Sequence, residues 1–250
     1  MQKFGLKLWS TNTDFYYEEA KKLHAQGWFD YVELYVVPGT LETLAQWAKL
    51  DIPFTIHAPH FAHGFNLAKK EKEQSNLKIY NEVKAFADEL NPDYIIFHGG
   101  IDGCIKETAR QLAAFNEPRA LIENKPFKAI PNKMGGEFCR GYNPEEIKFV
   151  IDKAGCGFCL DFGHATCAGR SLQQDLLPEF LELKPKMFHI TDLEDSEYDS
   201  HLHFGAGVLN IKGLLQTLPE NAKITIETNK NSKENLDDFI EDIKWLRNLK

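Results

Sequence analysis

The sequence predicts a single α/β domain over residues 1–250, folded as a (β/α)8 TIM barrel. Eight short runs rich in aliphatic and β-branched residues recur along the chain, and longer segments with helical spacing of apolar residues separate them. The hydrophobic content of 43% is enough for the core of one large domain. A doubly wound open sheet is the alternative, but it would more often begin with a glycine-rich phosphate loop, and LWSTNTD is not one.

The eight runs are the expected strands. They lie at residues 4–9, 31–36, 54–59, 94–99, 120–124, 157–162, 187–192 and 223–228. The clearest helical patterns between and after them lie at residues 41–50, 76–90, 143–155 and 235–249. The helix at 143–155 has defined ends, because Asn143 can cap it, Pro144 suits its first position and Gly155 suits its exit.

Composition and cysteine usage narrow the function classes. The net charge of −8 argues against a surface covered in basic residues and disfavours a nucleic-acid partner without excluding it. No run approaches the roughly 18 apolar residues of a membrane span, and the N-terminus lacks a long apolar signal region, so we expect a cytoplasmic protein with no membrane partner. Cys156 and Cys159 form a C-x-x-C at the start of a strand, where a redox pair is not expected.

Residues of metal-ligand type stand at the ends of the predicted strands. They are Glu33, His57, His98, Glu123, Asp161 with His164, His189 with Asp192, and Glu227. Any one of them alone is more often a hydrogen-bonded packing residue. Closing the barrel gathers them into one cup, where several carboxylates would repel one another unless cations compensated them. Imidazoles mixed with carboxylates suit zinc, manganese or iron, and the pattern predicts a divalent-metal site.

A second cluster follows the seventh strand, in DSHLHFGAG. Asp199 and His201 have alternating spacing, so both side chains would point the same way in an extended segment. A solvated polar loop is the alternative. Gly205 and Gly207 mark a bend that could return the segment over the barrel mouth.

The motifs TIHAPHFAHGFNLA, FHGG, LIEN, CLDFGHATCAG, HITD, DSHLHFGAG and ITIET, in this order, resemble the xylose isomerase-like TIM-barrel superfamily over about residues 30–230. Within it they are most similar to the endonuclease IV branch, the abasic-site DNA endonucleases. The resemblance implies three zinc ions. It places His57 and His98 on the first, with Glu123 bridging to the second; Asp161, His189 and Glu227 on the second; and His164, Asp199 and His201 on the third.

Two activities follow from the resemblance. The first is hydrolysis of a phosphoester by a metal-bridged hydroxide, with abasic-site DNA as one candidate substrate. The second is isomerisation or epimerisation of a sugar or sugar phosphate at a single metal ion, manganese or another divalent metal in place of zinc, with Glu123 and Glu227 as the acid and base. A catalytically silent metal- or sugar-binding barrel is a third class.

The chain also departs from the endonuclease IV pattern. VELYVVPGTLE passes from the second strand almost directly into a helix, where the DNA enzymes have a long basic loop, and Glu33 is more similar to the sugar isomerases. A segment at 124–143 carries Lys125, Lys128, Lys133 and Arg140, which could meet a phosphate. The expected substrate-binding residues are Glu33, His60, Lys125 and Arg140, with Trp9 and Phe61 as an apolar wall. The partner is DNA, a small phosphate ester or a sugar, and no oligomeric state is predicted.

Overall fold

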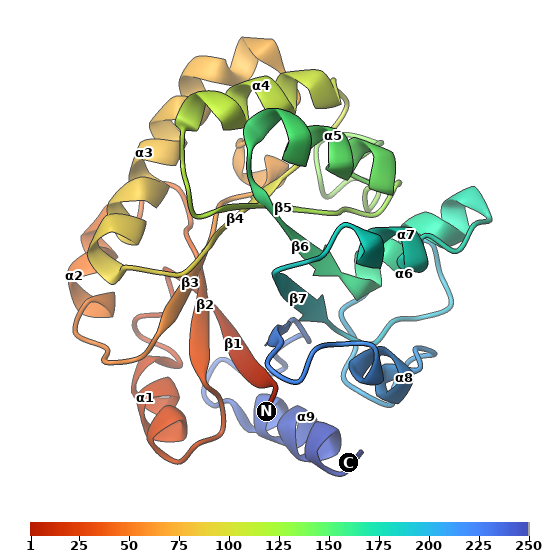
Figure 1. Cartoon of the computed structure of the whole chain (residues 1–250). Coiled ribbons are helices and arrows are strands. Elements are labelled where there is room, and N and C mark those ends of the chain that lie inside the picture. Colours follow the sequence, from red (N-terminus) through yellow and green to blue (C-terminus); the bar gives the residue numbers. More distant parts are fainter. Residues whose placement is uncertain (250) are drawn as a thin grey trace.

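The computed structural model describes residues 1–249, and its eight parallel strands close into a barrel in sequence order (Figure 1). Each predicted run forms a strand, which confirms the fold class. The strands are β1 Lys3–Trp9, β2 Tyr31–Tyr35, β3 Phe54–His57, β4 Ile95–His98, β5 Ala120–Glu123, β6 Gly157–Asp161, β7 Met187–Ile190 and β8 Lys223–Ile226.

Helices surround the barrel (Figure 1). They are α1 Tyr17–Ala25, α2 Leu44–Trp47, α3 Glu73–Leu90, α4 Ile105–Phe115, α5 Pro144–Ala154, α6 Phe162–Leu172, α7 Leu177–Glu182, α8 Ile211–Gln216 and α9 Asp237–Arg247. Short 3-10 helices span Leu41–Thr43, Phe61–His63 and Lys70–Lys72. The predicted ends of α5 are confirmed, since the Asn143 side chain accepts from the Glu146 N–H at 2.8 Å and Gly155 has a φ of 68°.

The helix predicted at 41–50 is shorter than expected. A 3-10 turn precedes α2, which has four residues, and the Leu50 N–H then bonds to the Trp47 carbonyl. Trp47 is fully buried and donates its indole N–H to the Ser10 carbonyl at 2.9 Å. One anchored side chain therefore holds this segment against the barrel, and a long amphipathic face is not needed.

The side chains inside the barrel form an apolar layer below a polar one. Tyr31, Ile96, Leu121, Cys159 and Met187 pack together as one buried cluster. Two positions further along the same strands stand Glu33, His98, Glu123, Asp161 and His189. Because successive strand residues face opposite ways, residues two apart share a face, and the five polar residues point to the same interior one layer nearer the strand ends.

Two further features of the strands concern Gly5, which packs against Tyr31, and the cysteine pair Cys156 and Cys159. A Cβ at Gly5 would lie 2.4 Å from the Tyr31 ring, so glycine is needed for Tyr31 to fill the barrel. Cys156 and Cys159 are free, and burial raises the pKa of their thiols to about 11 and 12. Neither holds the thiolate that a redox pair requires.

The part of the chain that the structure describes contains no helix long and apolar enough to cross a membrane.

Candidate metal centre

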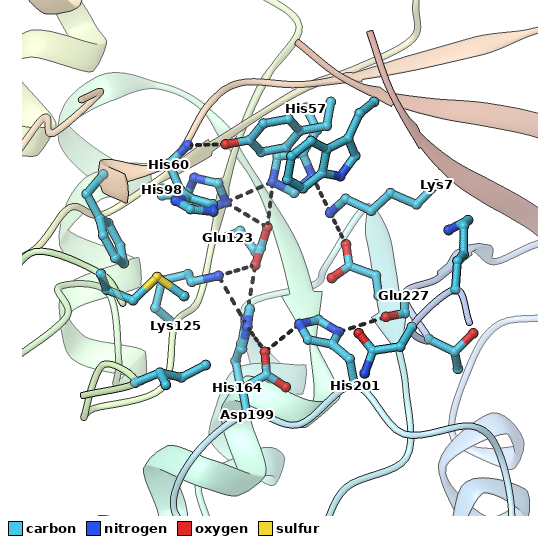
Figure 2. Close-up of a pocket in the computed structure, with 18 of the residues that line it drawn as sticks. Lys7, His57, His60, His98, Glu123, Lys125, His164, Asp199, His201 and Glu227 are labelled. Atoms are coloured by element: carbon cyan, nitrogen blue, oxygen red, sulfur yellow. Dashed lines mark hydrogen bonds and ion pairs between the residues drawn. The ribbon is translucent and has the colours of Figure 1, made fainter. Parts of the chain in front are cut away.

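The nine predicted metal ligands meet at the mouth of the barrel, and Figure 2 shows seven of them; Asp161 and His189 lie deeper. Their ligand atoms form overlapping groups in which all atoms lie within 4.8 Å of one another. We name three of them by position: the strand group is His57, His98 and Glu123, the central group is Glu123, Asp161 and His189, and the loop group is His164, Asp199 and His201. A fourth group joins Glu227 to Glu33, His57 and His189.

The strand group has nitrogen atoms that face one another. His57 Nε2 and His98 Nε2 are 2.8 Å apart, and they lie 3.4 and 3.3 Å from Glu123 Oε2. Burial lowers the pKa of both imidazoles, that of His98 to about 3, so both are neutral near pH 7. Glu123 Oε2 is buried and accepts no hydrogen bond from residues 1–249. Two imidazoles and a bare carboxylate oxygen aimed at one point fit a divalent cation.

Glu33 decides which nitrogen atoms are free. Its Oε1 accepts from His57 Nδ1 at 2.7 Å, and its Oε2 accepts from His189 Nε2 at 2.9 Å. Thr225 donates to the same Oε2 at 2.6 Å. The other ring nitrogens, His57 Nε2 and His189 Nδ1, then face the other ligands. Glu33 is fully buried behind the ligands and is not on the pocket wall, where a substrate contact was expected.

The central group contains further unpartnered atoms. Asp161 Oδ2 and His189 Nδ1 are buried without a hydrogen bond within the described chain. His189 Nδ1 lies 3.0 Å from Glu227 Oε1, 3.6 Å from Glu123 Oε2 and 3.8 Å from Asp161 Oδ2. Buried polar atoms left without partners cost folding energy, so their convergence indicates a ligand-binding position.

Asp161 also begins the next helix. Its Oδ1 accepts from the His164 N–H at 2.6 Å and caps α6, which sets the imidazole of His164 beside the carboxylate. A Cβ at Gly163 would lie 3.2 Å from that same Oδ1. The strand end, the cap and the third residue of the helix therefore place two ligands in one short stretch.

The loop group converges on Asp199. His201 Nδ1 donates to the Glu227 carbonyl at 2.7 Å, and His164 Nδ1 lies 3.0 Å from the Asn124 carbonyl. Both Nε2 atoms then face Asp199 Oδ2, at 2.6 Å from His201 and 3.2 Å from His164. Burial lowers the pKa of both imidazoles, but Asp161 raises that of His164 to about 10, and Asp199 raises that of His201. A proton or a cation must fill the space between these atoms.

The segment that carries Asp199 and His201 is held from its two ends by Asp192. This carboxylate accepts the N–H groups of Leu193, Gly205, Gly207 and Leu209 at 2.9–3.0 Å. The expected bend at Gly205 is present, with a φ of 83°. His201 has a φ of 50°, so the segment is not extended there as expected, although the two ligand side chains still meet. Asp192, expected only as a strand-end ligand type, is an anchor of this loop.

Two lysines lie among the ligands (Figure 2). Lys7 Nζ bonds to Glu227, lies 3.2 Å from Glu33 Oε1 and lies 2.8 Å from His57 Nδ1. Burial lowers the pKa of Lys7, but the neighbouring carboxylates Glu227 and Glu33 raise it by more. The net pKa is above its usual value, so Lys7 stays charged. Lys125 Nζ lies 3.2 Å from Glu123 Oε1 and from His164 Nε2. Sequence reasoning missed Lys7, although a charged residue within the apolar run FGLKLW was a usable signal.

A cavity of about 660 Å³ opens above the ligands. Trp9, Phe61, His60 and Lys125, all expected substrate contacts, line it, and Trp9 stacks on Tyr35 with ring centroids 5.1 Å apart. Arg140 does not line it. Its guanidinium donates to the Gly103 carbonyl at 2.7 Å and lies 3.5 Å from Glu146, which hold it on the loop away from the cavity.

The described residues thus fit metal ions and a small organic ligand together. The ligand set mixes imidazole nitrogen with carboxylate oxygen, which suits zinc and its neighbours. The cavity has the volume of a small-molecule site.

The chain is similar to several known proteins in sequence and in fold. A protein named "Probable endonuclease 4" from Halothermothrix orenii is 28% identical over 181 residues, which span 65% of this chain and 65% of that protein. A solved D-tagatose 3-epimerase-like protein superposes with a TM-score of 0.75 at 19% identity, covering 99% of this chain and 96% of its own. A protein from Thermus thermophilus, solved after soaking with ZnCl2, has a TM-score of 0.72 at 22% identity, covering 99% and 97%.

The two solved structures share the fold of this chain at low identity, and the epimerase-like activity named for the first is a property of that protein. A family model described as xylose isomerase-like TIM barrel matches residues 20–249, from the first helix to the last. With its closed barrel and its ligand-lined mouth, the chain belongs to the xylose isomerase-like TIM-barrel family.

Proposed function

We propose that the protein is a metal-dependent phosphoester hydrolase of the endonuclease IV type that binds up to three zinc ions. One observation carries the proposal: eight imidazole and carboxylate side chains fall into the strand, central and loop groups, Glu123 is shared by two of these groups, and Glu227 lies 3.0 Å from His189 of the central group. Similarity to proteins named probable endonuclease 4 supports it.

The strand, central and loop groups would each hold one ion, with Glu227 completing the central group. Bound zinc would supply Lewis-acid chemistry and a water molecule whose pKa is lowered to about 7. The other residues of the site would hold and orient the metal ligands. Glu33 orients His57 and His189, Lys7 holds Glu227, and Lys125 holds Glu123. Trp9 and Phe61 wall the cavity and restrict water.

The substrate is a phosphate ester that enters this cavity. Between β2 and the first 3-10 helix the chain has only the five residues 36–40, so no long arm stands there to enter a duplex. We therefore rank a small phosphate ester above abasic-site DNA. Five free cysteines fit a reducing compartment, and we place the activity in the cytoplasm.

Metal content per chain, measured by elemental mass spectrometry on protein purified without chelators, tests the metal count. We expect about three zinc ions. Activity assays on small phosphate monoesters and on abasic-site duplex DNA then test the reaction, with Glu227→Gln as the matched variant. Hydrolysis that survives in Glu227→Gln at the wild-type rate would contradict the arrangement.

A second candidate is a single-metal sugar isomerase or epimerase. Glu123 and Glu227 both line the cavity, which favours an acid and base pair acting on one bound sugar. Here His57, Asp199 and His201 would be dispensable. Replacing all three with alanine and finding one metal ion and unchanged sugar turnover would establish this activity in place of hydrolysis.

A further inference from the structure

Four lysines line the cavity, and they differ in what neutralises them. Lys7 and Lys125 contact carboxylates of the ligand cluster. Lys230 and Lys233 make no ion pair within 4.0 Å and no side-chain hydrogen bond to any residue in the range 1–249. Lys233 is exposed, whereas Lys230 is partly buried. A cation that is partly withdrawn from water without an anion costs free energy, which a bound anion would offset.

The position of Lys230 relates it to the metal ligands. It follows β8 by four residues and stands three residues after Glu227. The loop after the last strand of a (β/α)8 barrel is a frequent place for a phosphate-binding site. Burial and the charge of Lys7 lower the pKa of Lys230 to about 8, while Glu227 opposes the shift, which places this ammonium group in the field of the ligand cluster.

The loop that carries these lysines is tied to the loop after β1. The Tyr16 hydroxyl donates to the Ser232 carbonyl, and Tyr16 has a φ of 63°, a conformation that a bulky residue rarely adopts. Asn12 of the loop after β1 also lines the cavity; its Oδ1 accepts the Trp9 N–H at 2.7 Å, which leaves its amide N–H groups for a ligand. The two loops therefore form one wall with two free ammonium groups and a free amide.

We propose that Lys230, assisted by Lys233 and Asn12, forms an anion subsite that holds a phosphate group of a small substrate beside the metal ligands. Loaded metal ions would add positive charge to a cluster whose carboxylates are already partly neutralised by Lys7 and Lys125. A neutral sugar would leave that charge unpaired, whereas a phosphate dianion would match it. This subsite specifies the substrate class within the proposed function, and it rests on that function only for the identity of the reaction.

Phosphate binding tests the subsite without an activity assay. Inorganic phosphate is titrated into the metal-loaded protein by calorimetry, and wild type is compared with Lys230→Gln, Lys230→Arg and Lys153→Gln. Lys153 is an exposed lysine of α5 and gives the same change of charge away from the cavity. We expect Lys230→Gln to weaken phosphate binding by about tenfold or more, Lys230→Arg to retain most of it, and Lys153→Gln to change nothing.

Metal content is measured on every variant, because the metal ions themselves bind phosphate. Equal phosphate affinity in wild type and Lys230→Gln, at equal metal content, would overturn the subsite and leave hydrolysis standing. Loss of phosphate binding in Lys230→Gln with intact metal content would support the subsite even if no phosphoester is hydrolysed. Gluconate in place of phosphate separates the two anion sources: tighter binding of the carboxylate would overturn the assignment to phosphate.

Discussion

The strand group and the loop group lie at two sides of one cup, and they are prepared differently for a metal ion. His57 and His98 end neighbouring strands, are almost fully buried and have pKa values below the usual range. His164 is the third residue of α6, and His201 stands on a loop with 31% of its side chain exposed; the pKa values of both are raised. The imidazoles of the strand group are therefore neutral, whereas those of the loop group hold protons that a metal ion would displace under the proposed function.

The comparison separates two ways of building a ligand set. Strand ends are fixed by the hydrogen bonds of the barrel, and Glu33 orients one imidazole of the strand group, His57, and one of the central group, His189. The loop group depends on the Asp192 anchor and on the Asp161 cap, which are local devices outside the sheet. Metal affinity should consequently respond to different substitutions on the two sides.

Removing the shared ligand is expected to have the largest effect. Glu123→Gln takes a charge from both the strand group and the central group, so we expect loss of turnover by about 10³-fold or more and loss of bound metal from both groups. Steady-state kinetics and elemental analysis measure this. Normal metal content in the variant would show that the two groups do not share Glu123.

Removing a ligand of the loop group alone should sharpen the contrast. Asp199→Asn leaves the strand ends untouched, and we expect about 100-fold weaker binding of one ion with the others unchanged. Competition with a chromophoric chelator resolves the ions by affinity. Loss of every ion together would contradict the independence of the two groups.

The matching change below the strand group is Glu33→Gln. An amide cannot accept from both His57 Nδ1 and His189 Nε2 as the carboxylate does, so one histidine loses its set tautomer. We expect about 10- to 100-fold weaker binding in the strand and central groups, with the loop group unchanged. The same chelator competition applies, and an effect confined to the loop-group ion would reverse the assignment.

Changing the pH should distinguish the groups without a mutation. The pKa of His164 is raised to about 10, so metal binding there displaces a proton near neutral pH, and affinity falls by about tenfold per unit as the pH is lowered. The pKa of His98 is lowered to about 3, so its imidazole is neutral from about pH 5 to 8, and we expect strand-group affinity to be nearly flat there. Calorimetry in buffers of different ionisation enthalpy counts the released protons. Equal proton release from both groups would break the comparison.

The smallest expected effect concerns the loop anchor. Asp192→Asn replaces a carboxylate that accepts four backbone N–H groups, and we expect about 1–3 kcal/mol less stability. Denaturant unfolding measures this, with hydrogen exchange at Gly205 and Gly207 as the local readout. Unchanged exchange at those glycines would show that other contacts hold the loop.

The barrel and the meeting of most candidate ligands could be predicted, because both follow from the alternation of residues along the strands. Strand runs have a period of two, and a polar residue at each run's end places a ligand at the mouth, as for His57 and Glu123. Glu33 was also expected at a strand end, but it lies two residues before the end of β2 and bonds to His57 and His189 instead of lining the cavity. Arg140 lies off the cavity wall because the path of a long loop is set by contacts such as that with Gly103, which no local pattern encodes.

Lys7 and Lys125 bear on whether the barrel can fold before a metal ion binds. Buried carboxylates without cations would resist folding, as they do in small domains that stay unfolded until zinc arrives. Here the chain supplies two cations of its own. The ammonium groups of Lys7 and Lys125 contact Glu227, Glu33 and Glu123. We therefore expect the barrel to fold without metal and to stay folded, but inactive, when a chelator removes the ions. Under the proposed function, the number of active molecules would then depend on metal supply as well as on the amount of folded protein.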